Sequence, residues 1–128
     1  MKNTQKTALI FDDDEDILFV LSSILKELGW KAFYFTNCNN VIDKVNSIAP
    51  DIIFMDNWIP GTGGVIATQT LKQSAELKDI PVIYFSANNN IHSLAAEAGA
   101  DTYLAKPFEL ADLNQVLELV YKEPSQVG

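Results

Sequence analysis

The sequence is poor in the residues that form covalent and zinc cross-links. It contains one cysteine, Cys38, and one histidine, His92, among 128 residues. A single cysteine excludes an internal disulfide, and one cysteine with one histidine cannot supply a zinc cage. We therefore expect Cys38 to be a buried or half-buried thiol and His92 to be a solvated helix residue.

Positive charge and long apolar runs are scarce too. Lysine and arginine number 9 against 17 aspartates and glutamates, which gives a net charge of −8 and leaves no basic patch for a phosphate backbone. No apolar run approaches the roughly 20 residues of a membrane span. The opening MKNTQKTALIF meets acidic residues too soon to be a signal-peptide core. We expect a cytoplasmic protein that neither enters a membrane nor binds nucleic acid directly.

The chain does have enough apolar sequence for one core. Hydrophobic residues make up 48% of it, and no linker interrupts them, so we expect a single domain over 1–128. Runs rich in β-branched and aromatic residues predict strands, and apolar residues three and four positions apart predict helices. The expected strands cover residues 7–11, 31–35, 51–55, 80–85 and 102–105, and the expected helices cover 17–28, 38–48, 64–75, 90–98 and 109–121.

This alternation predicts an α/β fold, in which a parallel sheet carries helices on both faces. Such sheets bind ligands beyond the carboxyl ends of their strands. In the sequence, these ends are followed by Asp12, Asp13 and Asp14 after the first strand, Asp56 after the third, Ser86 after the fourth and Lys106 after the fifth. Carboxylates, a hydroxyl and an amine are therefore expected to meet at one edge of the sheet.

The expected cluster has the chemistry of a phosphoryl-transfer site. Two carboxylates about 4 Å apart repel by roughly 4 kcal/mol at an effective dielectric near 20, so a positive group must lie among them. An oxygen-only ligand set suits Mg²⁺ better than Zn²⁺, and Lys106 supplies a second, fixed positive charge. Ser86 can donate a hydrogen bond to a bound oxygen. Asp56 would then act as a nucleophile toward phosphorus and form an aspartyl phosphate.

Each residue also has a purely structural interpretation. An acid after a strand is commonly a helix N-cap, which is the main alternative for Asp14. A single serine is commonly a loop hydroxyl, and a lysine before proline commonly lies on the surface. The combination of acid, acid, hydroxyl and amine on separate strand ends favours the functional interpretation.

The chain resembles a receiver domain of two-component response regulators from about Lys6 to Tyr121. The matching segments are ALIFDDDEDIL, DIIFMDNWIPGTGG, PVIYFSA and GADTYLAKPF. The resemblance implies a doubly wound, flavodoxin-like (βα)5 fold with strand order 2-1-3-4-5. It also implies a cis peptide bond between Lys106 and Pro107, which is accessible because the cis form costs little before proline.

The resemblance assigns roles within the site. It implies that Asp56 is the phosphoacceptor and that Asp12, Asp13 and Asp56 bind Mg²⁺ together with the backbone carbonyl of Trp58. Lys106 would contact the phosphoryl oxygens. The implied donor is a sensor histidine kinase or a histidine phosphotransfer protein.

The resemblance also implies a switch. Ser86 and Tyr103 match the hydroxyl and aromatic positions that reorient on phosphorylation, which would shift a pre-existing equilibrium. The altered surface would span roughly residues 89–121 and bind a downstream protein target. The protein would be a monomer or a dimer promoted by phosphorylation, and a phosphoacceptor rather than an enzyme that turns over an external substrate.

Two residues depart from the family's usual pattern. Trp58 stands where smaller or polar residues are more usual, and Gly63 stands where aspartate is frequent. A bulky ring beside the phosphoryl group could exclude water, so we hypothesise slow autodephosphorylation, with packing of Trp58 on a partner or loop as the alternative. Asn88 occupies a position that tunes the same rate.

Three other functions remain to be compared. A haloacid-dehalogenase-like phosphatase would use Asp12 as nucleophile and Asp14 as general acid, but it needs a further acidic pair where this chain has only Asp56. A flavodoxin-like cofactor binder would bring its phosphate against three consecutive aspartates. A binding-only receiver would be expected to lack some of the site positions, which are all intact.

Overall fold

The computed structural model describes residues 5–120, and these form five βα units in strict alternation. The elements are β1 (Thr7–Phe11), α1 (Glu15–Glu27), β2 (Lys31–Phe35), α2 (Val41–Ile48), β3 (Ile52–Asp56), α3 (Gly64–Lys72), β4 (Val82–Ser86), α4 (Ile91–Ala98), β5 (Thr102–Ala105) and α5 (Leu110–Val120). The strands are parallel and lie in the order β2-β1-β3-β4-β5. The predicted fold class and strand order are therefore confirmed, as is the cis peptide bond between Lys106 and Pro107.

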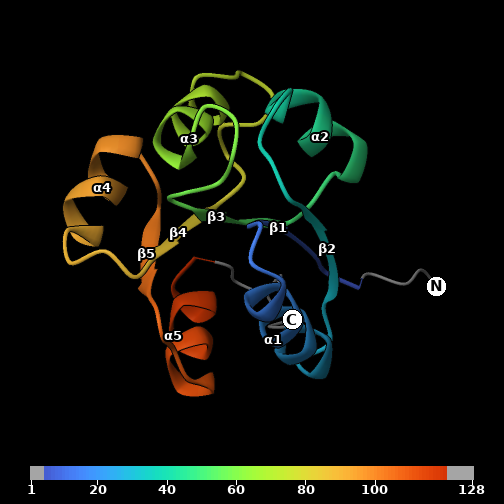
Figure 1. Ribbon diagram of the computed structural model, residues 1–128. Coiled ribbons are helices and arrows are strands. Elements are labelled where there is room, and N and C mark those ends of the chain that lie inside the picture. The colour runs from blue at the N-terminus through green and yellow to red at the C-terminus, as the bar shows by residue number, and fades with distance from the viewer. Residues whose placement is uncertain (1–4, 121–128) are drawn as a thin grey trace, which may run out of the picture.

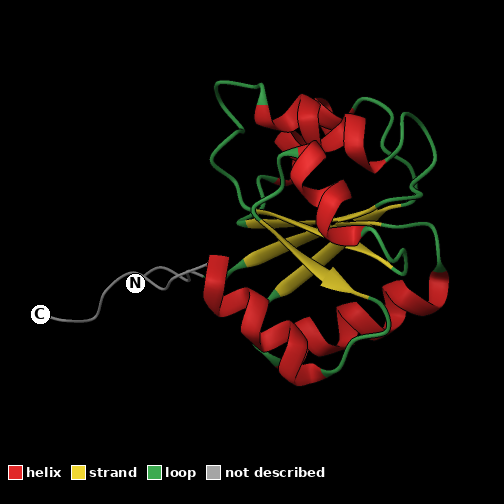
Figure 2. Cartoon of the chain, turned by 90° about the vertical axis from the view of Figure 1, so that its left-hand side faces the viewer, coloured by secondary structure: helices red, strands yellow, loops and turns green. Residues whose placement is uncertain are grey.

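Helices cover both faces of the sheet. Figure 1 shows α2, α3 and α4 above it and α1 and α5 below it, and Figure 2 shows the same three layers from the side. Side chains along each strand alternate between two core clusters: in β1, Leu9 and Phe11 pack above the sheet, and Ala8 and Ile10 pack below. The central strands β3 and β4 are buried along their whole length, so their sequences are continuously apolar up to their last residues.

Two strands end one residue later than the sequence indicated. Asp56 is the last residue of β3 and Ser86 the last residue of β4, whereas both were expected just beyond their strands. Both strands also begin later. Asp51 turns its carboxylate back to accept a hydrogen bond from Thr7 N at 2.8 Å, and Pro81, with no N–H, precedes β4. Asp56 and Ser86 are consequently held by the sheet itself.

Helix ends also differ from the expected bounds. α1 begins two residues before the expected 17 because Asp14 caps it, and α2 begins at Val41 rather than 38 because Asn40 adopts a left-handed conformation (φ 53°). α3 ends at Lys72 rather than 75. Of the expected 109–121 helix, residue 121 lies outside the described residues. Within residues 5–120, no helix is long and apolar enough to cross a bilayer.

Candidate functional site

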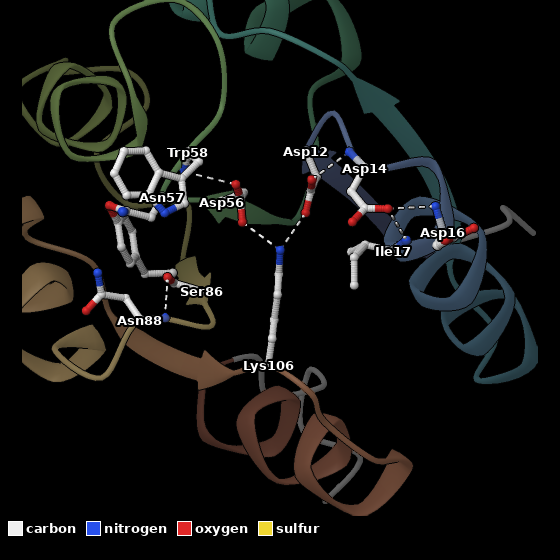
Figure 3. A network of polar contacts seen from close by, with 11 residues as sticks. Asp12, Asp14, Asp16, Ile17, Asp56, Asn57, Trp58, Ser86, Asn88 and Lys106 are labelled. Atoms are coloured by element: carbon white, nitrogen blue, oxygen red, sulfur yellow. Dashed lines mark hydrogen bonds and ion pairs between the residues drawn. The ribbon is translucent and has the colours of Figure 1, made fainter.

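Two carboxylates and one amine meet at the carboxyl edge of the sheet. Asp12 follows β1, Asp56 ends β3, and these strands are neighbours. The Lys106 ammonium, which follows β5, lies between them and donates to Asp12 Oδ2 at 3.0 Å and to Asp56 Oδ1 at 2.7 Å (Figure 3). The fold therefore brings together three residues that lie 94 and 50 positions apart in sequence.

These three groups are strongly coupled because little water reaches them. Asp12 is 1% exposed and Asp56 4% exposed. Burial raises the pKa of Asp12, and the charge of Asp56 adds to this, while the hydrogen bonds from Asp14 and Lys106 oppose it. Burial lowers the pKa of Lys106, but the hydrogen bonds to Asp56 and Asp12 outweigh it and the net pKa is raised. Two carboxylates thus share one ammonium, which leaves a negative charge that a cation can balance.

The backbone after β3 fixes the second oxygen of Asp56. Trp58 N donates to Asp56 Oδ2 at 2.9 Å. The intervening residue, Asn57, is held from both sides, because its N–H donates to Phe85 O at 3.2 Å and its carbonyl accepts from Gly64 N at 3.1 Å. A Cβ at Gly64 would lie 2.4 Å from the Asp56 carbonyl oxygen, so only glycine fits at the start of α3.

The two carboxylates that meet at Lys106, those of Asp12 and Asp56, fit a magnesium ion in kind. Asp13 is exposed, and residues 5–120 contain no group of three or more His, Cys, Asp or Glu side chains that could hold a metal. The structure thus brings Asp12 and Asp56 together but not Asp13. Carboxylates are hard oxygen donors, and Mg²⁺ is commonly bound through one or two of them while keeping several waters.

Asp14 is the N-cap of α1, which was the structural alternative to a role in the site. Its Oδ1 accepts from Asp16 N at 2.9 Å and from Ile17 N at 3.3 Å, and it caps α1. Its own N–H donates to Asp12 Oδ1 at 2.9 Å, which orients that carboxylate. As Figure 3 shows, Asp14 lies on the α1 side of Asp12, away from Asp56. A carboxylate already engaged by the helix N-terminus is poorly suited to be the general acid of a phosphatase.

Ser86 lies at the end of β4 with its hydroxyl buried and partly engaged. It is 1% exposed, and its Oγ accepts from Asn88 N at 2.9 Å, so the hydroxyl proton remains available to donate. Asn88 turns its own Oδ1 to Asn90 N at 2.7 Å. The Asn88 side chain therefore shapes the loop between β4 and α4 in this structure.

Tyr103 lies on the outer side of β5. It is 39% exposed, and its ring meets the ring of His92 edge to face, with centroids 5.5 Å apart. His92 is exposed on α4, as expected, but no sequence pattern predicted its contact with Tyr103. Cys38 is buried, as expected, and its sulfur lies 3.5 Å from Thr62 Oγ1.

One polar contact near the site was missed by sequence reasoning. Tyr84, in the middle of β4, is fully buried, and its phenol donates a hydrogen bond to Asn57 Oδ1. Burial, followed by the charges of Asp56 and Glu97, raises the pKa of Tyr84 to about 12. The available signal was the tyrosine itself, because a phenol in a buried strand needs a polar partner.

Comparisons with known proteins agree with this fold. The family model described as the response regulator receiver domain matches residues 8–118. The phosphate regulon transcriptional regulatory protein PhoB of Pseudomonas aeruginosa is 32% identical over 91% of this chain and 52% of its own length. The DNA-binding transcriptional regulator NtrC of Klebsiella pneumoniae is 32% identical over 88% of this chain and 24% of its own length. The chain thus spans about half or less of these relatives.

Solved structures give the same result. A putative response regulator from Chloroflexus aurantiacus superposes with a TM-score of 0.85, at 26% identity over 93% of this chain and all of that one. The receiver domain of the sensor histidine kinase PA1611 from Pseudomonas aeruginosa, with a magnesium ion coordinated in its active site cleft, shares the fold with a TM-score of 0.83, at 24% identity over 91% of this chain and 98% of that one. From the match over residues 8–118, together with the strand order, the chain belongs to the family of response regulator receiver domains.

Proposed function

We propose that the chain accepts a phosphoryl group on Asp56 from a sensor histidine kinase or a histidine phosphotransfer protein, in a reaction that requires Mg²⁺. The observation that carries this proposal is the position of the Lys106 ammonium, 2.7 Å from Asp56 Oδ1 and 3.0 Å from Asp12 Oδ2. A nucleophilic oxygen, a second carboxylate and a fixed cation are thereby assembled within a buried edge of the sheet. Such an arrangement can attract and neutralise a phosphoryl group.

In the reaction, an Asp56 carboxylate oxygen forms a bond to phosphorus. The bond between phosphorus and the donor atom breaks, and the donor keeps that electron pair. Lys106 then balances the added negative charge, and the backbone N–H of Trp58 holds the carboxylate in orientation. Mg²⁺, held by Asp12, Asp56 and the Trp58 carbonyl, would supply positive charge to the phosphoryl oxygens. Asp13, which is exposed beside Asp12, would act through water.

The proposed output is a change in the face formed by α4, β5 and α5. Ser86 would donate its hydroxyl proton to a phosphoryl oxygen, and the Tyr103 ring would leave His92 and turn inward. The outward ring and its His92 contact support the unphosphorylated state as the starting point. Phosphorylation would shift the population toward the inward state, with a different downstream protein bound by each state.

The proposal describes a phosphoacceptor that undergoes one modification and its reversal. It does not require turnover of an external substrate, which agrees with a family of signalling domains. The names of the relatives include transcriptional regulation and DNA binding. The acidic charge argues against direct DNA binding by these 128 residues, and a longer protein that contained them is outside that argument.

Incubation with acetyl phosphate, a small phosphodonor, tests the proposal directly. We expect the intact mass to rise by one phosphoryl group in the presence of Mg²⁺ and to stay unchanged with a chelator. The modified protein should return to its original mass over time. A folded chain that gains no mass would instead be a binding-only receiver, and steady release of phosphate with turnover would favour a phosphatase.

Trp58 provides a second measurement on the phosphorylated protein. Its side chain is 74% exposed, and Figure 3 shows the ring on the side away from Lys106. The ring can shield the phosphoryl group only by swinging over it, and in that position it would exclude water. On this hypothesis, Trp58→Asn should shorten the phosphoryl lifetime about fivefold, which corresponds to lowering the barrier to hydrolysis by about 1 kcal/mol. Val65→Ala, at the start of α3, serves as control. An unchanged lifetime in Trp58→Asn would contradict the hypothesis.

A further inference from the structure

A buried phenol lies beneath the loop that carries Asp56 and Trp58. Tyr84 is fully enclosed in the core cluster that β4 shares with α3 and α4, and its hydroxyl donates to Asn57 Oδ1. A buried phenol must find a partner or lose free energy, so this hydrogen bond is maintained by the burial of the ring. With a pKa raised to about 12, the phenol also stays protonated, and therefore a donor, at neutral pH.

The partner of this phenol occupies the one position between the acceptor and Trp58. Asn57 is fixed by three contacts: its N–H to Phe85 O at 3.2 Å, its carbonyl to Gly64 N at 3.1 Å, and its side chain to Tyr84. The first two contacts hold the backbone, and the third fixes the side chain from inside the core. Rotation of the peptide between Asn57 and Trp58 is thereby opposed from several directions.

That peptide matters because it lies at the acceptor. Its N–H, which belongs to Trp58, donates to Asp56 Oδ2 at 2.9 Å. A tilt of this peptide would turn the N–H away from Asp56 Oδ2. It would also move the carbonyl of Trp58, which is a magnesium ligand in the proposed function. Groups that orient ligands from behind typically affect metal affinity about 10-fold to 100-fold when removed.

We propose that Tyr84, acting through Asn57, is a positioning residue for the phosphoacceptor loop: its hydroxyl sets the orientation of the peptide between Asn57 and Trp58, and thereby the magnesium affinity of the site. The inference rests on the proposed function for the presence of Mg²⁺. It adds a residue that touches neither metal nor phosphoryl group. It also connects the acceptor loop to the core beneath α4, independently of Ser86 and Tyr103.

The test removes one oxygen atom and measures magnesium binding without phosphorylation. The chain has two tryptophans, and Trp58 is 74% exposed beside the site whereas Trp30 is 3% exposed in the lower core. Tryptophan fluorescence during a Mg²⁺ titration therefore reports on the loop. Tyr84→Phe should raise the half-saturating Mg²⁺ concentration about fivefold, below the usual range because Tyr84 acts through Asn57.

Two further variants test the route of the effect. Asn57→Ala should raise the half-saturating Mg²⁺ concentration by a similar factor. The double variant of Tyr84→Phe and Asn57→Ala should be no worse than either single one, because both remove the same hydrogen bond. In Tyr84→Phe and in Asn57→Ala, phosphorylation by acetyl phosphate should be slower than in the wild type at low Mg²⁺ and should reach the wild-type rate at saturating Mg²⁺. Independent effects that multiply in the double variant would contradict a shared route.

Matched controls separate positioning from general destabilisation. Tyr34→Phe removes a phenol that is 55% exposed on β2, at the far edge of the sheet, and should leave the Mg²⁺ midpoint unchanged. Val116→Ala destabilises the lower core without touching the loop. If Val116→Ala shifts the midpoint as much as Tyr84→Phe does, the role of Tyr84 is structural only and the inference is overturned.

The outcomes also separate this inference from the proposed function. If the wild type is phosphorylated but Tyr84→Phe leaves the half-saturating Mg²⁺ concentration unchanged, the proposed function stands and the inference is overturned. A wild-type chain that binds Mg²⁺ with a Tyr84-dependent midpoint, yet accepts no phosphoryl group, keeps the inference and contradicts the function. A wild-type chain with no fluorescence response to Mg²⁺ at any concentration overturns the inference.

Discussion

Replacing Asp56 with asparagine should abolish the one-phosphoryl mass gain seen with acetyl phosphate and Mg²⁺. The amide has nearly the same shape as the carboxylate but lacks an anionic oxygen able to attack phosphorus. Lys106 keeps Asp12 as a partner, because both carboxylates share the one ammonium. The loss should therefore come from the chemistry at Asp56. Intact mass before and after incubation measures it.

The same variant should remain folded, which makes its loss of phosphorylation interpretable. In the wild type, burial raises the pKa of Asp12 and the charge of Asp56 raises it further, so the negative charge of Asp56 disfavours ionisation of Asp12. A carboxyl group with a raised pKa adds stability at low pH and loses that contribution as the pH rises through its folded-state pKa. Without Mg²⁺ at neutral pH, removing one charge should leave the free energy of unfolding equal to that of the wild type or higher. Urea unfolding with a chelator present measures this.

The competing phosphatase makes the opposite prediction for the two aspartates. Its nucleophile would be Asp12, so phosphate release would survive Asp56→Asn and fail in Asp12→Asn. A mass gain that persists in Asp56→Asn and disappears in Asp12→Asn would likewise place the acceptor on Asp12. Either result would contradict the assignment of Asp56.

Local sequence was sufficient to predict the architecture of this protein. Continuously apolar strands alternating with amphipathic helices leave few alternatives to a parallel sheet covered on both faces. Once the sheet is parallel, the residues at the carboxyl ends of neighbouring strands must converge. Asp12, Asp56 and Lys106 were predictable for that reason, although the sequence could not show which oxygen faces which nitrogen.

Features that depend on side-chain direction could not be predicted in this way. Asp12 and Asp13 are adjacent and chemically identical, yet the first is buried and the second exposed. The Tyr84 hydroxyl meets Asn57 across two neighbouring strands, a contact that requires the register between β3 and β4. Likewise, the His92 contact with Tyr103 depends on how α4 packs against β5.

Replacing Lys106 with methionine should lower the free energy of unfolding by about 3 kcal/mol at pH 7 without Mg²⁺. The side chain of Lys106 is 15% exposed, and its two partners are almost fully buried. Methionine fills a similar volume but leaves both carboxylates without their cation, and an unpaired buried charge typically costs about 3–5 kcal/mol. The lower end applies because the Lys106 side chain is itself 15% exposed, so some water already reaches the site. Urea unfolding of the two proteins measures the difference.

The difference in the free energy of unfolding between Lys106→Met and the wild type, called the gap below, should depend on pH and narrow on both sides of neutrality. Losing Lys106 removes an interaction that lowers the pKa of Asp12, so this pKa should rise further. Stability from a raised carboxyl pKa is present at low pH and lost as the pH rises, so the gap should narrow as the pH falls toward about 4. The raised pKa of Lys106 contributes stability below its unfolded value of 10.5, and that contribution disappears as the pH rises through the folded value. The gap should therefore narrow at alkaline pH as well.

Lys72 provides the matched control for this argument. Its ammonium also pairs with an aspartate, Asp101, at 2.7 Å. That carboxylate is 42% exposed and directly precedes β5, at the amino ends of the strands. Lys72→Met should show a smaller gap with a weaker dependence on pH, because it leaves one partly exposed carboxylate without its cation rather than two buried ones. Mg²⁺ should stabilise Lys106→Met more than the wild type, because the variant's site carries one more uncompensated negative charge. A gap that stays constant from pH 4 to pH 8, or equal stabilisation of both proteins by Mg²⁺, would show that Lys106 does not balance the charges of Asp12 and Asp56.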